Sequence, residues 1–281
     1  MSSSQIVINS NNYDTDRKSF VYQFPVAQNL LNHEMAVTSI NIFNSFYNIS
    51  QDLNNNVMTI KFPSGASDYI TVNYTIPDGF YDTSSFYLLL QKAMYDNKLY
   101  IVNSDSSSKP ITYYLNLAVS ETQYANILTS FSVPTTATPP IDAPWSQLTG
   151  TQRSPTITFN SANGLLFGYT AGEYGSTSDT SLSTVSNITP QINPSQTVVL
   201  RCNAIQNIGL SFPSNFLYAL PINASFGSLI TQPQHEQIYN RIAPSQYSEI
   251  EIRLYDQNLE PLYLRDTNAL ITLSIRKTKE E

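Results

Sequence analysis

Short segments in which apolar and polar residues alternate recur along the 281-residue chain, and they constrain the fold more than any other feature. In the segment 247–256, Ile250, Ile252 and Leu254 alternate with charged residues. A period of two places alternate side chains on opposite faces of a β-strand, so one face is buried and the other is wet. The same pattern recurs in the segments 57–62, 69–76 and 268–277.

The number of such segments predicts an all-β fold. Further strand-like runs occur at 35–47, 110–119, 155–159 and 197–205, with a Pro-interrupted extended segment at 210–222. About eight strands separated by turn residues are typical of a β-sandwich or barrel. Two packed sheets bury one face of each strand, which explains the alternation. No repeat of fixed period occurs, so propellers and solenoids are disfavoured.

One segment changes its period and predicts a helix over 84–95. Its apolar residues recur at helical spacing and form one stripe: Phe86, Leu89, Leu90, Ala93 and Met94. The N-terminal turn is capped by a side-chain oxygen that accepts an amide hydrogen, and the candidates are Asp82, Thr83 and Ser84. We expect the stripe to pack in the core, whether or not the helix also serves assembly. Three residues remain as candidate contacts: Tyr87, Leu88 and Tyr95.

The domain organisation expected from composition is one arm and one domain. Residues 1–19 are polar, and we expect a free or tethering arm there. Residues 20–281 then form a single domain, with a Pro/Thr-rich loop insertion at about 120–153. The prolines of that loop cannot donate ladder hydrogen bonds. Its apolar residues either stitch the loop to the body or form an outward contact: Tyr124, Ile127, Leu128, Phe131 and Trp145.

The composition is poor in charge. Charged residues make up 12% of the chain, compared with roughly 25% in a typical soluble domain. An uncharged polar surface suits large contacts with many neighbours, although an AT-rich coding bias would produce the same composition. The net charge of −7 and the lack of a basic run argue against nucleic-acid binding. The N-terminus resembles no signal peptide and no run reaches membrane-spanning length, so we expect a soluble protein made in a reducing compartment.

The sequence carries no recognisable catalytic or metal-binding motif. The single cysteine, Cys202, is in phase with buried residues of a strand and is predicted to be inert. His33 and His235 have no nucleophile or metal ligand nearby in sequence, although a Cys202–His235 pair stays open because such partners are distant in sequence. Asp14 and Asp16 lack the oxygen spacing of a calcium loop. We therefore predict no catalytic, cofactor-binding or metal residues, no cofactor and no enzyme activity.

Several segments in order resemble the penton, or minor capsid, proteins of virophages and Polinton-like double-stranded DNA viruses. They are HEMAVTSINIFNSFYNIS, YTIPDGFYDTSSFYLLLQKAM, NGLLFGY, TVVLRCNAI and IEIRLYDQNLEPLYLRDTNALITLSIRK, the last resembling a final hairpin with Asp256 at its turn. In NGLLFGY, Phe167 precedes Gly168, whereas the family has a Leu-Gly-Phe turn. The resemblance covers most of 20–277.

This resemblance implies a single jelly-roll β-sandwich of two four-stranded antiparallel sheets. It also implies a structural virion protein that forms homopentamers and closes the five-fold vertices of an icosahedral capsid. Its partners would be itself and the double jelly-roll major capsid protein, without direct nucleic-acid binding or membrane insertion. On this reading the helix covers sheet ends at the rim. A viral receptor-binding or fibre-head-like β-domain is the alternative, and a cupin-type enzyme would need clustered histidines that two histidines cannot supply.

Overall fold

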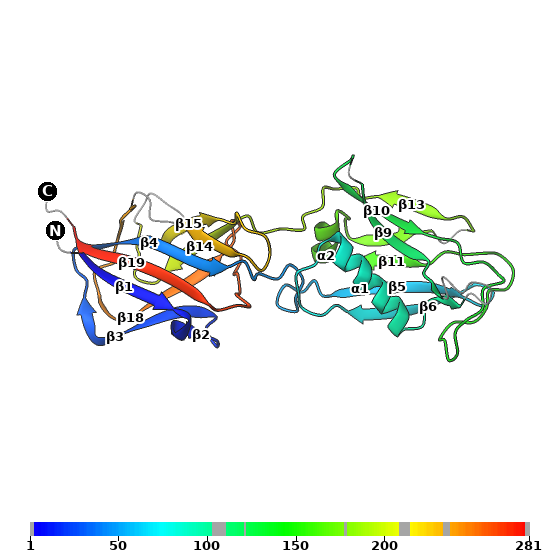
Figure 1. The fold of residues 1–281 in the computed structure, drawn as a ribbon, viewed down its shortest axis with the longest axis horizontal. Coiled ribbons are helices and arrows are strands. Elements are labelled where there is room, and N and C mark those ends of the chain that lie inside the picture. Colours follow the sequence, from blue (N-terminus) through cyan, green and yellow to red (C-terminus); the bar gives the residue numbers. More distant parts are fainter. Residues whose placement is uncertain are drawn as a thin grey trace. The chain divides into compact units, whose positions relative to one another are not determined.

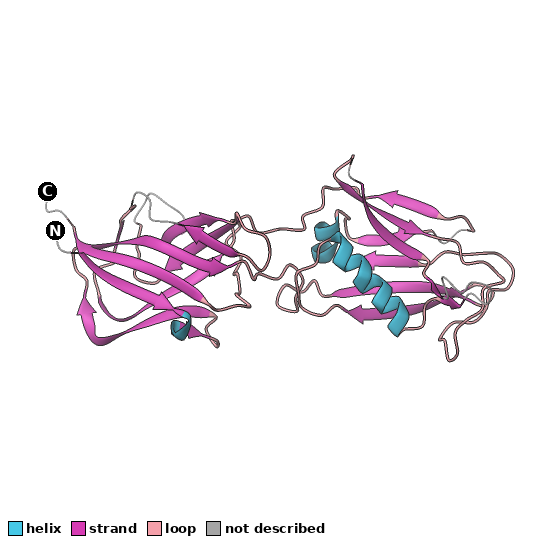
Figure 2. Ribbon diagram, viewed as in Figure 1, coloured by secondary structure: helices cyan, strands magenta, loops and turns pink. Residues whose placement is uncertain are grey.

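The computed structural model describes residues 3–102, 111–120, 122–176, 179–207, 214–232 and 237–278. Strands dominate this part of the chain, with two α-helices and one 3-10 turn (Figure 2). The chain divides into two compact units. The first, here called the jelly-roll unit, comprises Met1–Phe46 and Ser195–Glu281, and the second, the inserted unit, comprises Tyr47–Pro194. Each unit has its own hydrophobic core.

Two antiparallel sheets form the jelly-roll unit (Figure 1). One has the order β1-β19-β4-β16, with β17 also paired to β4, and the other has the order β2-β3-β18-β14-β15. Their strands are β1 (Ser3–Asn9), β2 (Tyr13–Asp14), β3 (Ser19–Asn29), β4 (His33–Phe43), β14 (Thr197–Cys202), β15 (Phe216–Pro221), β16 (Leu229–Gln232), β17 (Asn240–Arg241), β18 (Gln246–Tyr255) and β19 (Ala269–Lys277), with the 3-10 turn η1 at Ser10–Asn12.

The pairing of these strands is that of a jelly roll. The early strands β1, β3, β4 and β14 pair with β19, β18, β16 and β15, so the chain folds as a long antiparallel hairpin wrapped into two sheets. Two sheets built in this way are the eight-stranded double-sheet jelly roll. The short strands β2 and β17 are additions at its edges. The predicted jelly-roll fold is confirmed, but the expected single domain over 20–281 is wrong, because the jelly roll comprises Met1–Phe46 and Ser195–Glu281.

The core of this unit lies between the inner faces of the two sheets. The alternation in β18 and β19 points its apolar residues inward as predicted: Ile250, Ile252, Leu254, Ile271, Leu273 and Ile275 are buried. The two strands nevertheless do not form the final hairpin expected from the sequence, because β18 and β19 belong to different sheets. Asp256 lies at the connection between them, where its carboxylate accepts hydrogen bonds from the amides of Asn258 and Glu260.

The expected polar arm over 1–19 is wrong. Residues 3–9 form β1, which pairs with β19 over its whole length. As an edge strand, β1 buries only alternate side chains, and Ile6 and Ile8 fill this role with exposed fractions of 6% and 0%. Two apolar residues among many polar ones satisfy an edge strand, so low overall hydrophobicity did not reveal it.

The inserted unit lies in sequence between the third and fourth of the eight jelly-roll strands, β4 and β14. It contains a sheet of order β12-β11-β5-β6, a sheet of order β13-β10-β9 and a β7-β8 pair. Its elements are β5 (Val57–Ser64), β6 (Asp68–Thr75), α1 (Thr83–Asp96), β7 (Ile101–Val102), β8 (Ile111–Thr112), β9 (Leu115–Ser120), β10 (Ala125–Ser130), β11 (Thr156–Phe159), α2 (Ser161–Phe167), β12 (Gly172–Gly175) and β13 (Leu182–Val185). The predicted hairpin of β5 and β6 is present.

Helix α1 belongs to the inserted unit and not to the rim of the jelly roll. Asp82 is its N-cap, and the carboxylate accepts a hydrogen bond of 2.7 Å from the Ser85 amide. Every residue of the predicted apolar stripe is buried. Phe86 stacks on Phe167 of α2, with ring centroids 3.9 Å apart. The stripe thus forms the core of this unit, as predicted, but of a unit that sequence alone did not separate.

The segment 120–153 is not simply a projecting loop, because part of it lies in the inserted unit's core. Of the predicted cluster, Leu128 and Trp145 are buried, whereas Tyr124 and Phe131 are 77% and 40% exposed. The segment contains strand β10, which pairs with β9 and β13. Trp145 is 2% exposed and packs on Phe62, while its indole N–H donates a hydrogen bond to the Lys98 carbonyl. The proline-rich backbone around it is held by side chains and turns instead of by a ladder.

Arg153, the last residue of this segment, is buried. The Arg153 guanidinium donates hydrogen bonds to the carbonyl oxygens of Asp68, Ser64 and Gly65, at 2.8, 2.9 and 2.8 Å. It also lies 5.2 Å from the centroid of the Tyr69 ring. Arg153 therefore ties the end of the proline-rich segment to the turn between β5 and β6.

The role of β1 in the core generates a first prediction. Replacing Ile8 by Ala should lower the free energy of unfolding of the jelly-roll unit by about 2–4 kcal/mol, because it leaves a cavity between the sheets. Val7→Ala is the matched control, since Val7 lies on the opposite face and is 49% exposed, and its effect should stay within about 0.5 kcal/mol. Urea unfolding monitored by circular dichroism, with hydrogen exchange in 269–277, measures both. If I8A and V7A were equally stable, residues 1–19 would behave as the free arm that the sequence predicted.

The separate core of the inserted unit generates a second prediction. A polypeptide of residues 47–194 should fold alone, since its apolar cluster is complete within those residues. Trp145 is the sole tryptophan of the chain, so its fluorescence reports on this unit alone. Phe86→Ala should lower the urea midpoint, by about 3–5 kcal/mol in free energy, whereas the exposed neighbour Leu88→Ala should change it little. A solvent-exposed Trp145 spectrum in the isolated fragment would contradict this independence.

Candidate interaction surfaces

The jelly-roll unit presents two outer sheet faces of different chemistry. On the second sheet, the outward positions of β18 are charged: Glu249, Glu251 and Arg253. They face outward because the intervening Ile250 and Ile252 are buried between the sheets. The sequence predicted this orientation, and the structure adds partners that come from distant segments.

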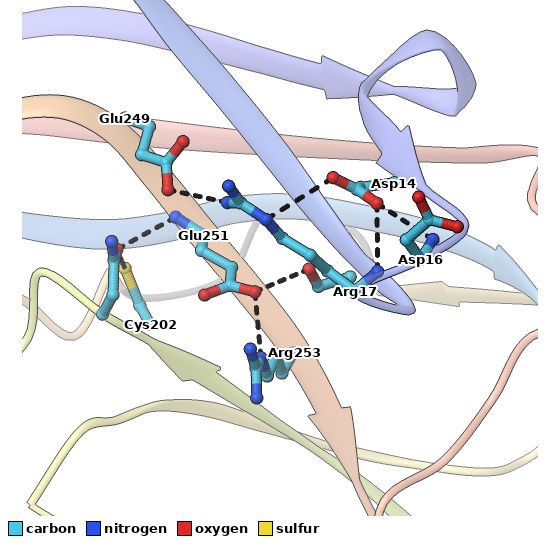
Figure 3. Close-up of polar contacts among 9 residues, drawn as sticks. Asp14, Asp16, Arg17, Cys202, Glu249, Glu251 and Arg253 are labelled. Atoms are coloured by element: carbon cyan, nitrogen blue, oxygen red, sulfur yellow. Dashed lines mark hydrogen bonds and ion pairs between the residues drawn. The ribbon is translucent and has the colours of Figure 1, made fainter.

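Arg17 links Glu249, at one end of this charged row, to Asp14 of β2 (Figure 3). Its Nη1 lies 2.7 Å from Glu249 Oε1, and its Nε lies 3.5 Å from Asp14 Oδ2. The hydrogen bond and charge of Glu249 raise the pKa of Arg17 above its usual range. Gln23 donates a further hydrogen bond of 2.9 Å to Glu249 Oε2. The loop between β2 and β3 is thereby fastened to the outside of β18.

Glu251 is held in the same way in the middle of the row (Figure 3). Its Oε1 accepts hydrogen bonds from the Ser19 hydroxyl at 2.7 Å and from Arg253 Nε at 2.9 Å. Bonding to Glu251 raises the pKa of Arg253. Each of these carboxylates is already paired within the face, so the row suits a stable hydrated surface better than acid–base chemistry.

The outer face of the first sheet is uncharged over most of its length. Val7, Leu229 and Leu270 are 49%, 44% and 40% exposed. Cross-strand register places polar uncharged residues among them: Thr272 pairs with Val7 and with Ser39, and Asn41 pairs with Leu270 and with Thr231. Burying such a face costs less than burying one that carries charges. Of the two faces, this one is better suited to contact with another protein.

Those candidate residues from the sequence that the structure describes do not converge on a chemical site. Cys202 is fully buried, and burial raises the pKa of its thiol to about 12, which makes it a poor nucleophile. His33 donates from Nδ1 to the Leu31 carbonyl at 2.7 Å. His235 lies outside the described residues, so the Cys202–His235 pair stays untested. Asp14 Oδ1 accepts hydrogen bonds from the amides of Asp16 and Arg17, both at 3.0 Å, and forms a local turn.

In the described part of the chain, no three His, Cys, Asp or Glu side chains gather in a way that could hold a metal ion. Within the same residues, neither helix has the length and apolar character needed to span a bilayer.

The inserted unit exposes aromatic and apolar residues on α1. Leu88 and Tyr95 are 64% and 51% exposed, as expected for candidate contacts, whereas Tyr87 is half-buried. Tyr95 stacks on Tyr100, with ring centroids 5.4 Å apart and nearly parallel planes. Tyr113 contacts Tyr100 edge-on. The sequence alone could not place Tyr100 and Tyr113 on this surface, because neither residue lies on helix α1.

Comparisons with known proteins give likenesses in structure only. No family model and no curated protein matches the sequence. Among solved structures, the mavirus penton protein matches with 10% identity and a TM-score of 0.43, over 98% of this chain and 97% of that one. A chain in the cryo-EM structure of the Sputnik virophage matches with 12% identity and a TM-score of 0.43, over 99% and 98%.

Proposed function

We propose that this chain is a structural virion protein: a penton, or minor capsid, protein whose pentamers close the five-fold vertices of an icosahedral capsid. The observation that supports it most is the agreement of the sequence resemblance with the strand order. The motifs that resemble the penton family include β4, β14 and the β18–β19 segment, which are parts of the jelly-roll pairing. The family's strand-turn-helix motif corresponds to β6 and α1 in the inserted unit.

A jelly roll alone does not decide function, since capsid proteins, lectins and cupins share it. Two further features favour a capsid subunit. Charged residues are scarce, and one sheet face is uncharged from β1 across to β16. A five-fold ring needs head-to-tail contacts between two different patches on each subunit. The two chemically different sheet faces supply patches that are not self-complementary.

The proposed partners are four further copies of this chain and the double jelly-roll major capsid protein around the vertex. A subunit at a capsid vertex must contact both kinds of partner at once. The chain offers two separately folded units for this purpose, each with its own exposed apolar residues: Leu229 and Leu270 in the jelly-roll unit, and Leu88 and Tyr95 in the inserted unit. We assign no nucleic-acid contact to either unit.

A receptor-binding or fibre-head-like role is the alternative. The exposed tyrosines of the inserted unit favour it, because tyrosine supplies large amphipathic contact area at low entropic cost. Fibre heads form trimers, so the oligomeric state separates the two functions.

Measuring the mass of the full chain in solution tests the proposal. Light scattering over a range of concentrations should find a species of five times the 31.4 kDa chain mass, and negative-stain images should show five-fold rings. The exposed substitution Leu270→Glu should weaken this species by placing a charge in the uncharged face, whereas Leu88→Glu in the inserted unit should leave it intact. A threefold mass with threefold rings would favour the fibre head, and a monomer at all concentrations would refute the homopentamer.

A further inference from the structure

A cavity of about 710 Å³ opens at one end of the jelly-roll unit, at β17 and the ends of β4 and β19. Its lining includes His33, Gln206, Phe216, Arg241 and Ile242. No acidic side chain belongs to the lining among the described residues. Pockets of about 300–1,000 Å³ that combine apolar walls with a few polar groups are typical ligand sites. The cavity is distinct from the outer faces of both sheets.

Among the described charged residues around this cavity, one arginine forms no ion pair. Arg241 lies directly across from Glu34 in the β17–β4 pairing. The Glu34 carboxylate, however, is bonded to Arg276, with Oε1 2.5 Å from Nε. Arg276 also lies over the Tyr239 ring, 3.5 Å from its centroid, which fixes the guanidinium in place. The Glu34 carboxylate is therefore paired with Arg276. Within the described chain, Arg241 forms no ion pair with a carboxylate.

Neighbouring residues increase this local positive charge. Lys277 is paired with His33 in the β19–β4 register, beside the cavity. In a chain of net charge −7, Arg241 and Arg276 both lie opposite Glu34 in the strand registers, and Lys277 follows Arg276. This end of the sheet therefore attracts an anion.

The walls decide which kind of anion fits. Phe216 and Ile242 are apolar, and Gln206 adds an amide. The amide groups of Asn207 and Asn240 donate to the carbonyl oxygens of Phe216 and Leu217, at 2.8 and 3.0 Å, so these side chains hold the wall in place. An inorganic anion would leave the apolar wall unused. A carboxylate on a chain that also carries an apolar group would use both.

We propose that this cavity binds an acidic peptide segment of a partner protein. The carboxylate of an Asp or Glu side chain pairs with the Arg241 guanidinium, whose planar fork matches a carboxylate in a bidentate arrangement. An apolar residue next to it in the peptide packs on Phe216 and Ile242. The Gln206 side chain is placed to hydrogen-bond the peptide backbone. The site does not depend on the number of subunits in the assembly.

Peptide probes test this site on the full chain. A panel of blocked tripeptides places Glu or Asp beside Phe, Leu or Ile, and each has a Gln or Asn counterpart. NMR titration of the isotope-labelled protein should show saturable binding of acidic members, with shifts at 241–242. The amide counterparts should bind roughly fivefold more weakly, the size expected when one exposed ion pair is lost.

Two arginine variants complete the experiment. Arg241→Gln should reduce the affinity for acidic peptides to that of the amide counterparts. Arg265→Gln removes the same charge at an exposed position outside the cavity lining and should leave binding unchanged. Both variants should unfold at the parent temperature, because both side chains are exposed.

Other outcomes overturn the proposal. Equal binding of acidic and amide peptides, retention of binding in Arg241→Gln, or no saturable binding by any member would each remove the assigned role of Arg241. Inorganic phosphate and sialyllactose serve as competing probes. Tighter binding of either one than of every acidic peptide would show an anion or glycan site instead of a peptide site.

Discussion

Pairing between the two ends of the chain is the constraint on which the jelly-roll unit depends. β1 has β19 as its partner, and β3 has β18, so each pair joins residues separated by more than two hundred positions. Such non-local pairing carries a large loop-closure cost before any contact forms, and it is typical of slowly folding β-proteins. In return, the inward-facing apolar residues of the alternating strands pack against the opposite sheet. The inner faces, and not any local turn, stabilise this unit.

The same pairing explains why a whole folded unit can be accommodated between β4 and β14. These two strands form the middle of the wrapped hairpin, and β4 pairs with β19 and β16 while β14 pairs with β18 and β15. None of those ladders requires a short connection from β4 to β14. Insertions are tolerated where the connecting backbone is not part of a ladder. The inserted unit in turn has a local core, in which β5 and β6 form a hairpin and α1 follows directly.

The sequence predicted those features that local periodicity encodes. The strand alternation placed Ile250, Ile252 and Leu254 correctly, and helical spacing located α1 within one residue at each end. The glycines of the segment 163–175 predict a turn, yet its first residues belong to helix α2, which is capped by Asn160 and ends at Gly168 with a positive φ of 86°. Sheet membership, the pairing of β1, and the burial of Trp145 depend on contacts between distant residues. Periodicity in one segment carries no information on these contacts. The cavity at Arg241 could not be predicted from the sequence for the same reason, because the charged residues around it come from three strands, β4, β17 and β19.

The order of the strands along the chain also determines when each strand can pair during translation. β19 lies between β1 and β4, and β18 lies between β3 and β14, so the central positions of both sheets are filled by the strands that leave the ribosome last. The inserted unit is complete by residue 194 and can fold while translation continues. Until residue 277 has emerged, β1 and β4 keep unpaired edges, which are templates for aggregation. A nascent chain halted near its end would therefore carry one finished unit and one open sheet, a species that chaperones must shield.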